Sequence, residues 1–69
     1  MGKPNIHVIR REDHKWVVKR ENVNGYAAAF DTQADADARG REIAKQDCVQ
    51  YYLHEEDGSI LFRDNYQNC

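Results

Sequence analysis

Residues 30–47, FDTQADADARGREIAKQD, decide the fold because they carry the signals of one amphipathic helix. Thr32 is followed three residues later by Asp35, which is the spacing of a capping box, and Asp31 is an alternative cap one residue earlier. Acidic side chains gather near the start of this stretch and basic ones toward its end, as the helix dipole favours. We therefore predict a helix from about Thr32 to Gln46.

The stretch DADARG at residues 35–40 also resembles the first half of a calcium-binding loop. Such a loop needs an oxygen ligand at its fifth position and a bidentate carboxylate at its twelfth, and these positions hold Arg39 and Gln46. The cation would repel the ion, and the amide would replace its strongest ligand. Each aspartate instead stands four residues before an arginine, an order that stabilises a helix by about 0.2–0.5 kcal/mol per pair. We expect these aspartates to bind no metal.

The predicted helix carries a narrow apolar stripe made mostly of small residues. Its members recur at helical spacing and are Ala36, Gly40, Ile43 and Ala44. A glycine in a helix interior costs about 1 kcal/mol relative to alanine. Gly40 therefore predicts a close approach of the helix to a sheet.

Two short β-branched and aromatic runs precede the helix. They are IHVI at residues 6–9 and WVVK at residues 16–19, and the polar segment between them predicts a first hairpin. Its register stays open at this point. A loop of even length pairs Ile9 with Trp16, whereas a loop of odd length pairs Val8 with Trp16, and this slip exchanges the two faces of the strand.

The dipeptide Asn24-Gly25 follows in the stretch VNGYAAAF. Both residues tolerate the positive φ of a type I′ turn, so the pair is a strong hairpin signal. We therefore predict a two-residue turn here and a short third strand over residues 26–30, although alanine is a poor strand former.

After the helix the apolar period changes to two, which indicates a strand over residues 49–54. Asp57-Gly58 then predicts a two-residue turn into a last strand. The predicted pairs are Leu53 with Phe62, Tyr52 with Arg63, and His54 with Leu61. We expect one face to carry Tyr51, Leu53, Ile60 and Phe62 toward the helix, and the other to carry Tyr52, His54, Leu61 and Arg63.

Together these elements predict an α+β domain in which a single helix packs on one face of a small, mainly antiparallel sheet. The sheet has four or five strands, in the order β-β-(β)-α-β-β. One domain spans residues 1–69, near the lower size limit for a single core, and we expect the tail at 65–69 to fray. The helix-side core is predicted to hold Trp16, Ile43, Leu53 and Phe62.

The bulk composition limits the function classes. Charged residues make up 32% of the chain, and the net charge of −2 argues against a general nucleic-acid binder. Without a membrane-spanning apolar run or a secretory pattern, we expect a cytoplasmic protein with no membrane partner. In that compartment Cys48 and Cys69 are expected to be reduced and unpaired.

Short motifs along nearly the whole chain resemble a small bacterial family known as domain of unknown function 2188. The motifs are HVI, WVVKRE, FDTQADA, REIAK, H-x-x-DG-x-I and RDNY. The resemblance implies a compact α+β domain with one helix on an antiparallel sheet, and it implies no established activity. The chain departs from the family pattern at Asp37 and Arg39, which implies a more solvated helix flank, and at Asn65, where members commonly carry serine.

Catalytic and metal chemistry lack a diagnostic motif in this sequence. Cys48, Ser59 and the three histidines show no nucleophile-and-base signature, so we expect no enzyme and no cofactor. A zinc site needs about four ligands at short paired spacings, whereas these residues are scattered. His7 and His54 could still meet across neighbouring strands, but two ligands alone would hold a metal only weakly.

A single helix covers one face of the sheet and leaves the other face to water or to a partner. The interface candidates on that uncovered face are Val17, Lys19, Tyr52, His54, Leu61 and Arg63, with Arg63 expected to stack on the ring of Tyr52. We therefore expect a protein-interaction module that binds another protein or a second copy of itself. The alternatives are a nucleic-acid-binding accessory protein using the same face, and a small acidic inhibitor of a host or phage defence enzyme.

Overall fold

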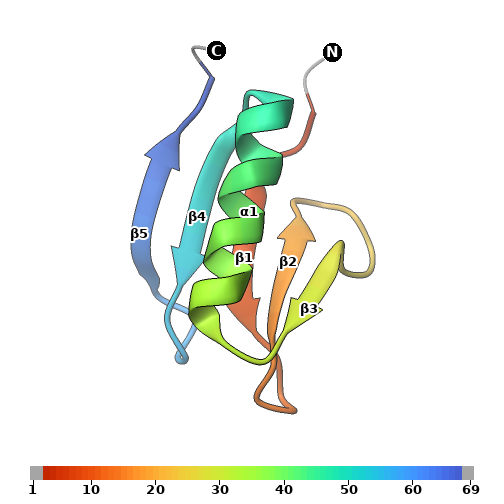
Figure 1. Ribbon diagram of the computed structural model, residues 1–69, viewed down its shortest axis with the longest axis vertical. Helices are drawn as coiled ribbons and strands as arrows, with labels where there is room; N and C mark the ends of the chain where they lie inside the picture. The colour runs from red at the N-terminus through yellow and green to blue at the C-terminus, as the bar shows by residue number, and fades with distance from the viewer. Residues whose placement is uncertain (1–2, 68–69) are drawn as a thin grey trace.

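The computed structural model describes residues 3–67 and contains one helix packed on a five-stranded sheet (Figure 1). The sheet order is β3-β2-β1-β4-β5. All neighbouring strands are antiparallel except β1 and β4, which run parallel in the middle of the sheet. The element bounds are β1 (Ile6–Arg10), β2 (Trp16–Arg20), β3 (Ala28–Phe30), α1 (Gln33–Asp47), β4 (Gln50–His54) and β5 (Ile60–Asn65). The predicted α+β class and element order are confirmed, with five strands.

Helix α1 begins where the capping signal predicts. Thr32 is the N-cap in an extended conformation, and its hydroxyl accepts a hydrogen bond of 3.2 Å from the Asp35 amide. The helix ends at Asp47, and its C-cap is Cys48, which adopts a left-handed conformation with φ of 58° and donates its amide to the Ala44 carbonyl. The described part of the chain contains no free cysteine, so the expected unpaired thiol at Cys48 is wrong. Cys69 lies outside the described residues.

Gly40 sits where the helix approaches the sheet most closely. A Cβ atom added at Gly40 would lie 2.7 Å from Cε1 of Tyr51 and 2.8 Å from Cγ2 of Val8. No ordinary side chain fits at these distances. The close approach predicted from a glycine in a helix interior is therefore confirmed, and it brings α1 down onto β1 and β4, the central strands.

The β1–β2 hairpin adopts neither predicted register, although it keeps the faces of the odd alternative. Ile9 pairs with Val17 rather than with Trp16, and Val8 and Trp16 share the helix side of the sheet. The loop closes with a 2.7 Å hydrogen bond from the amide of residue 11 to the carbonyl of residue 15, and His14 adopts a φ of 68°. A three-residue loop with a left-handed third residue therefore sets this register.

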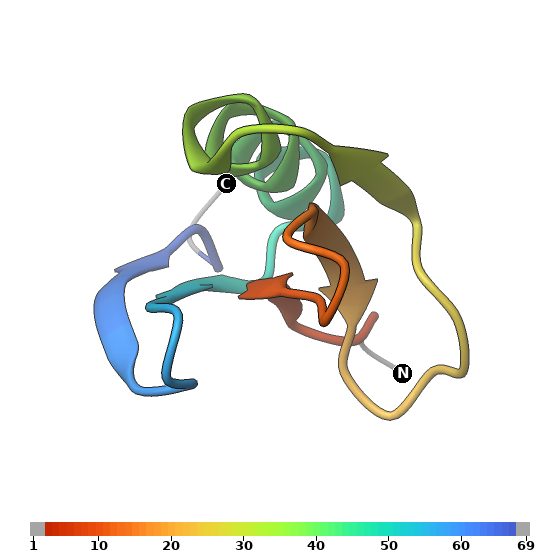
Figure 2. The same ribbon diagram turned by 90° about the horizontal axis from the view of Figure 1, so that it is seen from below.

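The predicted two-residue turn at Asn24-Gly25 is wrong. The chain turns earlier, because Asn22 adopts a φ of 61° and the Val23 amide donates to the Arg20 carbonyl at the end of β2. A seven-residue connection over residues 21–27 therefore links β2 to a β3 of only three residues. Figure 2 shows this connection swinging to the side of the sheet away from the helix.

The β4–β5 hairpin also uses a three-residue loop rather than the predicted two-residue turn. The Glu55 amide donates to the Ser59 carbonyl at 2.8 Å, and Gly58 occupies the left-handed position with φ of 91°. His54 consequently pairs with Ile60, and the predicted pair of His54 with Leu61 is wrong. The loop geometry matches that of the first hairpin.

A bulge at Leu61 restores the predicted strand pairing after this longer loop. Leu61 is left without a partner on β4, and the next pairs, Leu53 with Phe62 and Tyr52 with Arg63, are those predicted. The bulge reverses the two faces predicted at the start of β5. Ile60 now shares the uncovered face with His54, while Leu61 lies on the helix side.

The core lies between α1 and strands β1, β2 and β4. Trp16, Ile43 and Leu53 are buried there as predicted. Phe62 lies on the helix side too, but it is 43% exposed because the helix packs on every strand except β5. No helix in residues 3–67 combines the length and apolar character needed to span a membrane.

Candidate functional site

The six predicted interface residues do not form one surface. Lys19, Tyr52 and Arg63 lie on the uncovered face together with His54. Val17 belongs to the same face but is fully buried, so it cannot contact a partner. The remaining candidate, Leu61, lies on the other side of the sheet because of the bulge. The expected apolar patch on the uncovered face is therefore wrong.

A polar group of side chains, here called the histidine cluster, occupies this face instead: His7, Glu21, Tyr52 and His54. Nδ1 of His7 lies 2.9 Å from Nε2 of His54, and Nε2 of His7 lies 3.2 Å from Oε1 of Glu21. The His7 ring also stacks on Tyr52, with centroids 4.9 Å apart and planes 16° from parallel. The two histidines therefore meet across neighbouring strands, which the sequence left open as a possibility.

Neighbouring groups fix the cluster in place. The side-chain amide of Asn5 donates to Oε2 of Glu21 at 3.3 Å, and the Tyr52 hydroxyl donates to Oε1 of Gln50 at 2.5 Å. Nδ1 of His54 lies 3.0 Å from the Gly58 carbonyl. Sequence reasoning missed Glu21 and Asn5. The only signal was their position at strand ends that meet once β1 pairs with β2.

Tyr52 and Arg63 face each other on β4 and β5 as predicted. The ring of Tyr52, however, stacks with His7 on β1, and Arg63 takes part in no cation–π contact among the described residues. The expected stacking of Arg63 on Tyr52 is wrong, because the parallel β1–β4 pair brings an imidazole to the ring instead.

The histidine cluster does not form a metal site. Glu21 and His54 approach opposite ring nitrogens of His7, so the three groups do not point at a common centre. Within residues 3–67 no group of three or more histidine, cysteine, aspartate or glutamate side chains is placed to hold a metal ion.

Exposed apolar side chains gather on β5, with one on the uncovered face and two on the helix side. Ile60, Leu61 and Phe62 are consecutive and are 54%, 50% and 43% exposed. β5 is also an edge strand of six residues. The Tyr66 amide bonds to the Val49 carbonyl, so by antiparallel alternation the backbone N–H and C=O of Arg63 point to the free edge.

Arg41 ties this edge strand to the helix. Its Nε lies 3.0 Å from Oδ1 of Asp37, as the four-residue spacing predicts, and its Nη1 lies 3.5 Å from Oδ2 of Asp64. The guanidinium stands 4.7 Å from the centre of the Phe62 ring and donates to the Tyr66 hydroxyl at 3.2 Å. The expected fraying therefore does not apply to Tyr66, and Asn65 is the last residue of β5.

Asp37 receives a second hydrogen bond from inside the core. The hydroxyl of the fully buried Tyr51 donates to Oδ1 of Asp37 at 2.5 Å. Burial and this neighbouring carboxylate raise the pKa of Tyr51 well above its ordinary value. Asp37 is thus structural, whereas Asp35 and Arg39 form no pair, since Arg39 bonds to Glu42.

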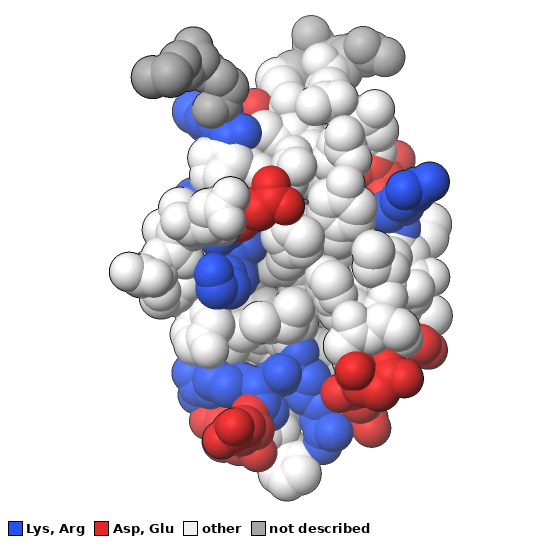
Figure 3. Space-filling model, turned by 180° about the vertical axis from the view of Figure 1, so that it is seen from behind, with Lys and Arg blue, Asp and Glu red and all other residues white. Residues whose placement is uncertain are grey.

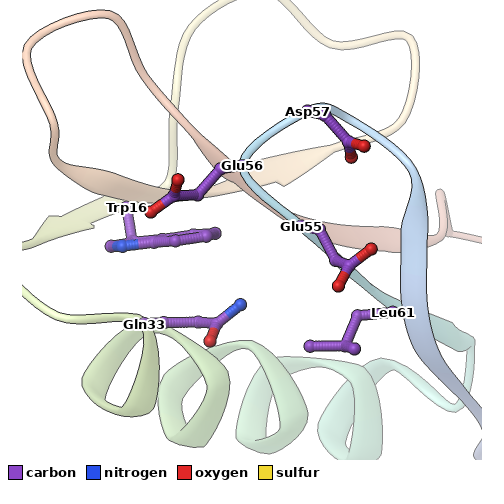
Figure 4. A pocket seen from close by; sticks show the side chains of 6 residues that line it. All are labelled: Trp16, Gln33, Glu55, Glu56, Asp57 and Leu61. Atoms are coloured by element: carbon purple, nitrogen blue, oxygen red, sulfur yellow. The ribbon is translucent and has the colours of Figure 1, made fainter.

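A pocket of about 440 Å³ lies between the start of α1 and the β4–β5 loop (Figure 4). Trp16, Gln33 and Leu61 line it, and three carboxylates stand at its rim. Those carboxylates already have partners. The Ser59 hydroxyl lies within hydrogen-bond distance of Glu55 and Asp57, the Ser59 amide donates to Asp57, and Arg10 pairs with Glu56. Nothing in this pocket calls for a particular ligand.

Charges on the uncovered face collect at its rim and lower end, and its middle is mostly uncharged (Figure 3). Basic side chains in the β1–β2 hairpin have acidic partners: Arg10 contacts Glu56, Arg11 contacts Asp13, and Lys15 contacts Asp31. Lys19 donates to the Val23 carbonyl at 2.8 Å. A phosphate backbone would have to displace these contacts, which does not favour nucleic-acid binding.

Comparison with known proteins identifies the family but no function. The profile of the family described as "Uncharacterized protein conserved in bacteria (DUF2188)" matches residues 6–66. No curated protein and no solved structure matches the chain. The match runs from the first residue of β1 to Tyr66 and so includes every strand and the helix. The chain therefore belongs to the bacterial DUF2188 family.

Proposed function

We propose that this protein is a non-enzymatic interaction module that pairs with a second copy of itself through the free edge of β5. The observation that carries the proposal is the coincidence of two features on one strand. β5 is an unpaired edge, and its first three residues expose apolar side chains on both faces of the sheet. Isolated apolar residues on a surface are ordinary, whereas a contiguous group marks an interaction site.

Backbone hydrogen bonds give this edge its binding capacity. An exposed edge strand presents unpaired N–H and C=O groups that can accept a strand of another chain. The Arg63 amide and carbonyl supply such groups in the second half of β5. The neighbouring Asn65 amide is already bonded to Oδ1 of Asp64 at 2.9 Å, which limits pairing at the end of the strand.

A second copy is the occupant that the geometry favours. Antiparallel pairing of two β5 strands has two-fold symmetry, so each chain offers the same surface and the assembly closes as a dimer. A domain of 69 residues has a small core and gains stability when it buries such a surface. On the uncovered face, the residues that flank this dimer interface would then be Tyr52, His54 and Arg63. Lys19 would lie farther away.

Sedimentation velocity across a wide range of protein concentrations tests the proposal. The wild-type chain is expected to form a dimer. Leu61→Lys is expected to give a folded monomer, because it places a charged side chain in the β5–β5 interface. Val23→Lys is the matched control, because Val23 is apolar and 43% exposed, close to the 50% of Leu61, but lies in the connection before β3. It should dimerise like the wild type.

Two outcomes would reject the proposed β5–β5 interface. One is a wild-type chain that remains monomeric at millimolar concentration, which would also rule out self-association as the function. The other is a dimer that persists in folded Leu61→Lys, which would place the interface elsewhere. Circular dichroism on each variant establishes that it is folded.

A further inference from the structure

The histidine cluster contains a hydrogen-bond chain that ends in an acceptor on each side. One end is the Glu21 carboxylate at 3.2 Å from Nε2 of His7, and the other is the Gly58 carbonyl at 3.0 Å from Nδ1 of His54. Between them Nδ1 of His7 lies 2.9 Å from Nε2 of His54. Three hydrogen bonds therefore involve all four ring nitrogens.

When both rings are neutral, they carry too few protons to form all three of these hydrogen bonds. A neutral imidazole carries one N–H and one acceptor nitrogen, so the two rings supply two protons. Neither a carboxylate nor a carbonyl can donate, and each of the three bonds needs one proton. With two protons, two acceptor atoms must face each other at one of the three contacts, and a third proton removes that conflict.

We propose that His7 and His54 form a proton-binding site that holds one additional proton shared between the two rings. The resulting imidazolium donates at one end to Glu21 and is bonded at the other to the second ring. This inference is independent of the proposed self-association. Its effect is that the uncovered face gains one positive charge within the pH range where histidine changes charge, about 5 to 8.

The charged groups around the cluster are consistent with one added proton. Glu21 is the carboxylate in contact, and Asn5 holds its second oxygen. The Tyr52 ring stacked on His7 favours a cation at its face. Lys19 is the cross-strand neighbour of His7, but its ammonium group is directed to the Val23 carbonyl, and Arg63 lies opposite Tyr52 on β5. A fourth proton would instead turn the contact between the rings into two opposed donors.

The sign of the pH effect follows from this count. In the folded protein the third proton completes a row of three hydrogen bonds that the unfolded protein lacks, so unfolding releases a proton near neutral pH. Stability should therefore rise as pH falls from about 8 toward the unfolded histidine value of about 6.5. Below that value the unfolded chain binds two protons on these histidines and the folded chain only one, so stability should fall again.

Imidazole nitrogen NMR across this pH range tests the proposal directly on the wild-type protein, with a metal chelator present. We expect the His7 and His54 nitrogens to change protonation as a coupled pair with hydrogen-bonded N–H signals. Independent titration of His7 and His54 would overturn the proposal.

Variants provide a second, separate readout. Thermal unfolding as a function of pH should lose its maximum in His54→Gln and keep it in His14→Gln, a matched substitution in the β1–β2 loop. A folded His54→Gln protein with an unchanged pH profile would also overturn the proposal. If His54→Gln does not fold, the wild-type nitrogen titration decides.

Discussion

β3 and β5 are both edge strands of the same sheet, but the helix packs on only one of them. β3 has three residues, two of them alanine, and lies against α1 and the core. β5 has six residues, exposes three large apolar side chains and is linked to the helix through Arg41. The difference shows that a single helix stabilises one half of this sheet and leaves the other half suited to association.

The largest expected effect compares two residues that face each other across β4 and β5. Leu53 is 8% exposed, whereas its partner Phe62 is 43% exposed. Leu53→Ala should lower the free energy of unfolding by about 2–5 kcal/mol because it leaves a cavity in the core. Phe62→Ala should cost much less, although phenylalanine is larger. Urea unfolding of both variants measures these changes. Equal losses in the free energy of unfolding would contradict the claim that the helix covers Leu53 on β4 but leaves Phe62 on β5 exposed.

Gly40 offers a second test of the helix-covered half. Alanine is the better helix former by about 1 kcal/mol, so Gly40→Ala would stabilise an exposed helix. Here its Cβ would overlap Tyr51 and Val8, and the overpacking should cost about 1–3 kcal/mol instead. Thermal unfolding of Gly40→Ala decides between the two, and a raised melting temperature would show that the helix does not rest so closely on the central strands.

Arg41 provides a test of how the weakly covered half is held. Arg41→Ala removes contacts to Asp37, Asp64 and Phe62, and we expect a loss of about 1.5–3 kcal/mol, the range for hydrogen bonds to charged groups. Hydrogen exchange should accelerate in β5 more than in β1. Arg39→Ala is the control, since its partner is an exposed helix residue, and it should change stability by about 0.5 kcal/mol or less. Equal effects of the two substitutions would contradict the role of Arg41 in holding β5 against the helix.

The smallest effect lies in the loops of the two hairpins, which share one geometry. The Arg11 guanidinium lowers the pKa of the exposed Asp13 to about 2, and the Ser59 hydroxyl and amide lower the pKa of Asp57 in the other loop. Because both carboxylates favour the charged form in the folded chain, their stabilisation is present above the unfolded value of about 3.9 and is lost as pH falls below it. Carboxyl-carbon NMR should show the pKa of Asp13 rising toward that value in Arg11→Gln, with Asp57 unchanged. A pKa for Asp13 that does not respond would contradict this pairing.

The parts of this fold that sequence reasoning predicted correctly depend on local chemistry. The cap at Thr32 and the tight approach at Gly40 each follow from residue types a few positions apart. The pairing of Leu53 with Phe62 was predicted through a two-residue turn that the hairpin does not have, and it is found because the bulge at Leu61 offsets the longer loop. The register of the first hairpin did not follow, because its left-handed loop position holds His14 rather than glycine. The turn predicted at Asn24-Gly25 is wrong because the chain turns earlier, at Asn22.

The candidate site was harder to predict because it depends on strand order. The bulge at Leu61 reversed the faces of two β5 residues, and it arises from a loop one residue longer than the turn signal indicated. The contact of His7 with Tyr52 needs β1 beside β4, a parallel pair that the sequence pattern did not specify. The position of Glu21 beside His7 depends on the register of the β1–β2 hairpin, which the sequence left open.

Hydrogen exchange at the Arg63 amide as a function of protein concentration is the most direct test of the central claim that β5 is the interaction edge. If two β5 strands pair, this amide becomes protected as the dimer forms, while the outward-pointing amides of β3 exchange at the same rate at every concentration. Exchange of the Arg63 amide that does not change while the protein dimerises would contradict the account, because the dimer would then use another surface.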